Sequence, residues 1–229
     1  MIKSLNKTLL LTMVLIASQS ILAQENELKQ ITDKLDDLAT KISEARKKII
    51  PKLSKELEAI LDNLGMSQAR FSIKNSLSEN YFKNGKDTLQ FLFSANKGGQ
   101  FGELKKVASG GELSRIMLAI KKVLSENSQL PTIIFDEIDT GVSGEISNKM
   151  ASIMSTMSEQ MQVITITHLP QIAAKGNQHY KVYKEEVNNS TTTSLKQLSE
   201  DERIVEIAEM LSGKDISESA LTHAKELLN

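Results

Sequence analysis

The chain has 229 residues, of which 40% are hydrophobic and 25% are charged, and its net charge at neutral pH is −1. These values are typical of a soluble globular protein and exclude one that binds nucleic acid through a strongly basic overall charge. The absence of cysteine excludes disulfides, zinc-thiolate sites and thiol catalysis.

The first segment, residues 1–24, has the layout of a secretory signal peptide. Lys3 and Lys7 precede an apolar run from Leu9 to Ala17, and small residues follow up to Ala23. The run is too short to span a bilayer comfortably. Two interpretations stay open. One is an export signal, whose removal would leave a mature protein without a membrane segment. The other is an apolar helix at the start of a truncated or mis-started reading frame.

Residues 25–64 are predicted to form one long helix. Its apolar residues alternate steps of three and four, which is the spacing of a coiled-coil seam: Leu28, Ile31, Leu35, Leu38, Ile42, Ala45 and Ile49. The stripe slips by one residue at Pro51, where we expect a kink or a break because proline lacks a backbone donor. The helix is either one strand of an antiparallel coiled-coil arm or an amphipathic helix packed on its own domain.

Residues 65–229 are predicted to form an α/β lobe, because strand patterns alternate with helical ones. The strand at 131–136 lacks polar alternation, so we expect both of its faces to be buried. A methionine stripe in the helix after it is expected in the core. The predicted elements are two strands within 70–95 around an Asn84-Gly85 turn, a helix at 112–126, the strand at 131–136, a helix at 145–160, a strand at 162–167, a hairpin around Asn188-Asn189, and helices at 201–211 and 217–228.

A glycine pair opens the helix at 112–126. In Ser109-Gly110-Gly111, the two glycines let the backbone approach a ligand closely, and Ser109 adds a hydroxyl. The free N–H groups and positive dipole end of the helix favour an anion. The segment is either a contact for a terminal phosphate or an ordinary helix start after a loop.

Two strands end in residues with catalytic potential. Asp136 and Glu137 end one strand and His168 follows the next, and ligands of open α/β sheets collect at such carboxyl ends. Asp136 is a candidate magnesium ligand, and Glu137 is a candidate to position or deprotonate an attacking water. A lone histidine is more often structural, but the order of the three motifs is more specific than any one of them. No G-x-x-x-x-G-K-[ST] loop occurs, so the usual phosphate cradle is missing.

Three segments closely resemble the RecN family of bacterial DNA repair proteins, relatives of SMC proteins with ABC-type ATPase heads. They are Ala108 to Arg115, Phe135 to Gly144, and Thr167 to Ala174. The likeness extends from about Ile42 to the C-terminus and covers only the C-terminal part of such a protein. It implies the C-terminal lobe of an ABC/SMC-type ATPase head, which is a P-loop NTPase fold lacking its P-loop half, with an N-terminal coiled-coil helix.

The resemblance also implies residue roles. Ser109, Gly110, Gly111 and Glu112 would be the signature that contacts the γ-phosphate of ATP bound to an opposing head. Asp136 would hold magnesium, Glu137 would be the catalytic carboxylate, and His168 would be the switch histidine that senses the γ-phosphate. Asp139 to Gly144 would form the loop that meets the other head, with Asp139 among the ATP-binding residues. The implied activity is ATP-gated head engagement on DNA during double-strand-break repair in the cytoplasm, at the nucleoid.

The missing P-loop limits what this chain does alone, because phosphoryl transfer depends on the positioning and charge neutralisation that the P-loop provides. We hypothesise that the chain alone neither binds ATP tightly nor hydrolyses it. ATP and Mg²⁺ are expected only in a composite head, completed by a P-loop-bearing N-terminal half or a second head in a dimer. The alternatives are a catalytically inactive coiled-coil interaction module and an exported fragment.

Overall fold

The computed structural model describes residues 2–142, 144–187 and 190–229. Three predicted features fall wholly or partly outside them: the Asn188-Asn189 turn, Ser143 of the Asp139–Gly144 loop, and Met1 with most side chains of the signal-like segment. The chain forms two compact units, each described separately. The arm unit comprises Met1–Lys52 and Ile73–Gln90, and the lobe unit comprises Leu53–Ser72 and Phe91–Asn229.

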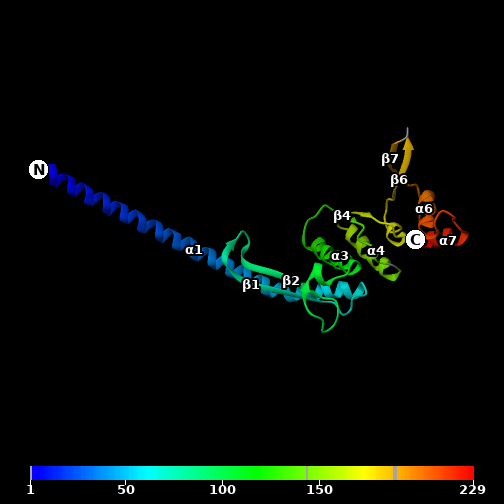
Figure 1. The fold of residues 1–229 in the computed structure, drawn as a ribbon, viewed down its shortest axis with the longest axis horizontal. Helices are drawn as coiled ribbons and strands as arrows, with labels where there is room; N and C mark the ends of the chain where they lie inside the picture. The colour runs from blue at the N-terminus through cyan, green and yellow to red at the C-terminus, as the bar shows by residue number, and fades with distance from the viewer. Residues whose placement is uncertain (1, 143, 188–189) are drawn as a thin grey trace. The chain divides into compact units, whose positions relative to one another are not determined.

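Helix α1 runs without interruption from Ile2 to Asn63 (Figure 1). It therefore begins earlier than the predicted helix, and the predicted break at Pro51 is wrong. Proline at this position removes the hydrogen bond to one carbonyl, that of Lys47. Both residues are exposed, so water can satisfy this carbonyl, and the long helix tolerates the local defect. Among the described residues, no helix combines the length and the apolar character needed to cross a bilayer.

In the arm unit, the end of a hairpin is fastened to α1 by ion pairs. The hairpin consists of β1 (Arg70–Phe82) and β2 (Gly85–Ser94), which are neighbours in one sheet. The guanidinium of Arg46 donates to the carboxylate of Asp87 at 2.8 Å and to the carbonyl of Asn84 at 2.8 Å. Burial opposes ionisation of Asp87, but hydrogen bonds from Arg46 and Ser43 outweigh it and hold the pKa of this carboxyl below its usual value.

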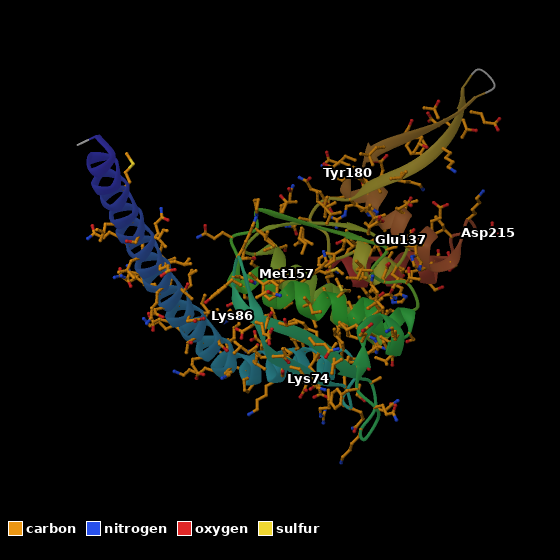
Figure 2. The ribbon with its side chains drawn as sticks, turned by 60° about the vertical axis from the view of Figure 1, so that its left-hand side comes forward. Lys74, Lys86, Glu137, Met157, Tyr180 and Asp215 are labelled. Atoms are coloured by element: carbon orange, nitrogen blue, oxygen red, sulfur yellow. The ribbon has the colours of Figure 1, made fainter. Side chains whose placement is uncertain are left out.

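A second contact with the arm helix lies nearer the hairpin turn. The hydroxyl of Tyr81 donates to the carboxylate of Asp36 at 2.7 Å, and the ammonium of Lys86 donates to the same carboxylate at 3.1 Å. Figure 2 shows Lys86 beside the helix. Between these contacts Ala39 and Ser43 are buried, so one side of the arm helix is covered by the hairpin.

Most of the predicted coiled-coil seam lies outside the part of the arm helix that the hairpin covers, although Ile42 lies against Gly85 of the hairpin. Its large members are all exposed, and they are Leu28, Ile31, Leu35, Leu38, Ile42 and Ile49. Within the arm unit, no described segment buries this stripe. A seam without a covering partner favours the arm interpretation over a helix packed on its own domain.

From residue 91 onward, the lobe unit contains the predicted strands and helices in the predicted order, with three short additions, whereas most of the hairpin predicted within 70–95 belongs to the arm unit. The additions are β3 (Gly102–Glu103), α2 (Leu104–Val107) and α5 (Pro170–Ala173). The remaining elements are α3 (Gly110–Asn127), β4 (Thr132–Asp136), α4 (Glu145–Ser158), β5 (Gln162–Ile166), β6 (Tyr180–Val187), β7 (Ser190–Gln197), α6 (Glu200–Ser212) and α7 (Glu218–Leu228). Strands β4 and β5 are parallel, whereas β6 and β7 form an antiparallel hairpin.

The main core of the lobe lies between β4 and the helices α3 and α4, which lie side by side (Figure 1). Phe135 points into this core from β4, and Leu118 points into it from α3. The methionine stripe of α4 is confirmed as core, since its buried members are Met150, Met154 and Met157. A second cluster packs the end of α1 against β1, β2 and α3 around the tilted ring pair Phe71 and Phe93.

The predicted burial of both faces of β4 is wrong for this chain. Ile133 is only 7% exposed and faces the methionine core, but its neighbour Ile134 is 57% exposed. In β5, Ile164 pairs with Ile134, and both Ile164 and Ile166 are exposed on the same side. Parallel sheets of α/β proteins are normally covered on both faces. The open isoleucine face, formed by Ile134, Ile164 and Ile166, is therefore an apolar surface that the described residues leave uncovered.

Candidate functional site

The acid pair and the histidine both lie at the carboxyl ends of β4 and β5, on the same end of the two-stranded sheet. Asp136 is paired with Ile166 in the parallel register, so the residues that follow both strands leave the sheet together. The backbone N–H of Glu137 extends the ladder by donating to the carbonyl of Ile166 at 3.0 Å. His168 lies two residues beyond the end of β5. Figure 2 marks Glu137 at this end of the sheet.

Glu137 has a backbone conformation that is rare for a residue with a side chain. Its φ is 46°, and it is the one non-glycine residue with positive φ among the described residues. The backbone N–H and hydroxyl of Thr140 donate to the carbonyl of Glu137 at 3.2 and 2.9 Å and hold this turn. Such conformations cost on the order of 1–3 kcal/mol and cluster at functional sites. The strain lies on the residue predicted to be the catalytic carboxylate.

Asp139 is the buried centre of the site. It is fully buried, and one of its carboxylate oxygens, Oδ2, accepts a hydrogen bond from the hydroxyl of Thr167. The Thr167 hydroxyl in turn accepts from the backbone N–H of Leu169 at 3.0 Å. The other oxygen, Oδ1, is buried and has no hydrogen-bond partner among the described residues. The Nδ1 atom of His168 lies 3.8 Å from it, and that imidazole is 66% exposed.

The glycine pair lies at the start of α3, as predicted. Ser109 caps the helix, and the carboxylate of Glu112 accepts hydrogen bonds from both the backbone N–H and the hydroxyl of Ser109, each at 2.8 Å. The backbone hydrogen bond, followed by that from the hydroxyl, holds the pKa of Glu112 below its usual value. Glu112 is thus an ionised group that fixes Ser109.

The start of α3 packs against the loop that follows β4. A Cβ on Gly111 would lie 2.8 Å from the carbonyl oxygen of Gly141, which is closer than side-chain carbons approach oxygen. Gly111 therefore allows the backbones of the two segments to touch, and the structure brings the Ser109–Glu112 segment and the Asp139–Gly141 loop together. Gly110 differs, because a Cβ there would meet open space among the described residues.

Arg115 is a residue whose role the sequence reasoning missed. Its Nε donates to the carbonyl of Gly111 at 3.1 Å, and its guanidinium donates to the carbonyl of Leu64 at 3.0 Å. It thereby joins the segment that follows α1 to the first turn of α3 within the lobe. The sequence shows an arginine in the second turn of an otherwise apolar-periodic helix. Its partner Leu64 is 51 residues away, and a local pattern does not identify it.

The site is an open edge with few metal ligands. No group of three or more acidic or histidine side chains suited to a metal occurs among the described residues. Asp136 is exposed, and a single carboxylate fits Mg²⁺ when phosphate oxygens and water supply the other ligands. A shallow cavity of about 570 Å³ lies at the opposite end of β4, between Ser125 and Pro131 and beside Met161, and does not include Glu137.

Solved structures define the class of fold. The Smc head domain with coiled coil and joint from Pyrococcus yayanosii matches 85% of this chain with a TM-score of 0.56 and 16% sequence identity, over 36% of its own length. An SMC ATPase studied for ATP-driven dimerization and DNA-stimulated activation matches 74% of this chain and 98% of its own, with a TM-score of 0.50 and 18% identity. The fold is that of the C-terminal lobe of an SMC-type, ABC-class ATPase head, with an N-terminal helix.

The sequence relatives of this chain are proteins named DNA repair protein RecN. DNA repair protein RecN of Haemophilus influenzae is 37% identical over 202 residues, which are 88% of this chain and 36% of that protein. RecN of Rickettsia prowazekii is 39% identical over 227 residues, which are 99% of this chain and 40% of that protein. No family model matches the chain. The chain is thus a relative of RecN that corresponds to its C-terminal part and spans 36% to 40% of the length of these two proteins.

Proposed function

We propose that this chain supplies one half of a composite ATP-binding head in RecN-like DNA repair. The observation that carries the proposal is the open isoleucine face beside Glu137. One side of the β4–β5 sheet is buried in the methionine core, and the other side exposes Ile134, Ile164 and Ile166. An apolar sheet face next to polar strand ends is typical of an incomplete α/β domain. The proposed cover is the P-loop-bearing N-terminal half of a RecN-type head.

In this proposal Asp136 and Glu137 act at the strand edge. Asp136, exposed at the end of β4, contributes the carboxylate ligand of Mg²⁺, and the ion neutralises phosphate charge when it is bound. Glu137 orients the attacking water and accepts its proton. The strained turn at Glu137 supports this role, because it fixes where the chain leaves the strand. His168 is exposed and able to reach a phosphate brought by the second half.

The signature residues have different roles in this proposal. Ser109 and Gly110, at the positive end of α3, meet the γ-phosphate of ATP held by an opposing head. Glu112 holds Ser109 in place and does not touch phosphate, because a carboxylate and a phosphate repel each other. Asp139, which is fully buried, acts through its neighbours and does not contact ATP directly.

Gly110 and Gly111 provide a matched pair for testing this assignment. Gly111 has a reason to be glycine within the chain, namely its contact with Gly141, whereas Gly110 has none. A glycine in the first helical turn without steric need is explained by close approach of a ligand from outside the chain. We expect Gly110→Ala to leave the lobe folded, or to stabilise it by about 0.5–1 kcal/mol, and to abolish ATP hydrolysis by the composite head.

The whole-protein context follows from the relatives and is part of the same proposal. The relatives are named DNA repair proteins, so we propose a role on DNA in the cytoplasm, at the nucleoid. A signature that acts on ATP of an opposing head implies a dimer of heads. The SMC ATPase named for ATP-driven dimerization supports this arrangement for the fold.

The test is reconstitution. The full chain is mixed with the N-terminal part of RecN from Rickettsia prowazekii, ending where its alignment with this chain begins, and phosphate release is measured with ATP and Mg²⁺. We expect hydrolysis by the mixture, its loss in Glu137→Gln and Gly110→Ala, and none by either part alone. Gly111→Ala reports on folding, since it disturbs the contact with Gly141. A mixture that forms a complex but is inactive with the native chain would contradict the catalytic proposal and leave an interaction module.

A further inference from the structure

Asp139 has an unsatisfied oxygen that points to a further role. Its Oδ1 is buried without a partner among the described residues, although its Oδ2 accepts from Thr167. A buried carboxylate oxygen without a donor costs on the order of 1–3 kcal/mol or more, so such atoms are rare and call for an explanation. The imidazole of His168 can supply a donor, and its Nδ1 lies 3.8 Å from this oxygen.

The gap is too long for a hydrogen bond and short enough to close by movement of one side chain. Hydrogen bonds from nitrogen to oxygen need about 2.7–3.2 Å. Asp139 is fixed by burial and by Thr167, but His168 is 66% exposed and free to rotate toward it. Closing the gap satisfies the orphan oxygen and leaves the second ring nitrogen, Nε2, directed away from Asp139.

We propose that Asp139 is a positioning residue that holds His168 in the tautomer with the proton on Nδ1. A carboxylate only accepts, so its partner nitrogen must carry the proton. In the neutral ring Nε2 is then the bare nitrogen, and the tautomer of a histidine is set by the hydrogen bond that its other nitrogen makes. The inference rests on the proposed function only for what Nε2 meets: a bare nitrogen accepts, so its partner at the head interface is the O–H of a water.

The tautomer is measurable in the isolated full chain without nucleotide. The chain has three histidines, so ¹⁵N resonances of the imidazoles can be assigned by single substitutions. The spectra are recorded over a pH series, and the tautomers are read on the alkaline side, where the imidazole shifts no longer change with pH. His223 in α7 is exposed and serves as the internal reference. We expect Nδ1 of His168 to have the shift of a protonated nitrogen and Nε2 that of an unprotonated one, unlike the ratio at His223.

Asp139→Asn tests the cause. In this variant the Thr167 hydroxyl still donates to the side-chain oxygen, so the amide NH₂ faces His168 as a donor. Nδ1 of His168 must then accept, and we expect the proton of His168 to move to Nε2. Asp136→Asn is the matched control, because it removes one nearby negative charge without touching Oδ1 of Asp139, and it should leave the tautomer unchanged. If Asp139→Asn does not fold, the native chain still decides the question.

The outcomes separate this inference from the proposed function. A tautomer ratio at His168 equal to that at His223 in the native chain overturns the inference, as does a shift that persists in folded Asp139→Asn. In the reconstituted head, Asp139→Asn should lower kcat with little change in KM for ATP, as expected of a residue that acts through another. A correct tautomer with an inactive reconstituted head would instead contradict the proposed function.

Discussion

The arm and the lobe share one property. Each has a buried side, whose residues pack within the unit, and an exposed side, whose apolar residues have no partner in the unit. In the arm, Ala39 and Ser43 are buried under the β1–β2 hairpin, and the seam residues such as Leu35 are exposed. In the lobe, Ile133 and Phe135 are buried against the methionine core, and the open isoleucine face is exposed. The difference separates the contacts that stabilise the chain itself from the apolar surfaces that we propose another polypeptide covers.

The largest expected effect on stability comes from a substitution on the buried side of the lobe. Phe135→Ala should lower the free energy of unfolding of the lobe by about 3–5 kcal/mol, because it leaves a cavity in the methionine core. The matched substitution Ile134→Ala, one residue away on the exposed side, should change the free energy of unfolding by about 1 kcal/mol or less. Chemical denaturation of both variants measures the difference. Equal losses would show that the two sides are not distinct.

In the arm, Arg46→Ala is expected to release the hairpin, since it leaves the buried carboxylate of Asp87 without its cation. The expected loss is about 3 kcal/mol, and hydrogen exchange should show lost protection in residues 73–90. Leu35→Ala, on the exposed seam, should leave that protection unchanged. Unchanged hydrogen exchange in Arg46→Ala would show that the Arg46–Asp87 ion pair does not hold the hairpin on α1.

A smaller effect is expected at the junction between the end of α1 and the signature helix. Arg115→Ala removes the donors to the carbonyls of Leu64 and Gly111 and should destabilise the lobe by about 1–3 kcal/mol. Glu126→Ala in the same helix, which removes an exposed carboxylate paired with Lys122, is the control and should cost about 0.5 kcal/mol or less. Thermal unfolding of both variants decides whether this junction is structural.

The smallest effect should depend on pH. The pKa of Glu112 is lowered in the folded chain from its ordinary 4.5 by hydrogen bonds from Ser109. The folded state therefore favours the ionised form, and the resulting stabilisation is present above the ordinary pKa and lost as pH falls through the folded pKa. Glu112→Gln should cost about 1 kcal/mol or less at neutral pH, and the difference from the native chain should shrink in acid. A constant difference across pH would contradict this assignment.

The sequence predicted the elements of the lobe because their apolar periods are local. The methionine spacing of α4 and the glycine pair at the start of α3 report directly on one buried face and one helix start. The burial of β4 was mispredicted for a physical reason. Ile134 is exposed in this chain, and in the proposed composite head the apolar run of β4 is explained by a second part that covers this face.

The remaining differences come from contacts that a local pattern does not contain. Arg115 meets Leu64 and Asp139 meets Thr167 across 51 and 28 residues. The rule that proline interrupts a helix also fails at Pro51, where an exposed position satisfies the freed carbonyl with water. The candidate site was therefore predictable as a set of motifs, but the residues that position it were not.

The central claim, that this lobe is half of a composite ATP site, is tested most directly by titrating a fluorescent ATP analogue with Mg²⁺ into the full chain, first alone and then with the N-terminal part of a RecN relative. The account predicts no saturable binding by the chain alone and binding after the second part is added, weakened by Ile134→Asp on the open isoleucine face. Micromolar affinity of the isolated chain for the nucleotide would contradict it.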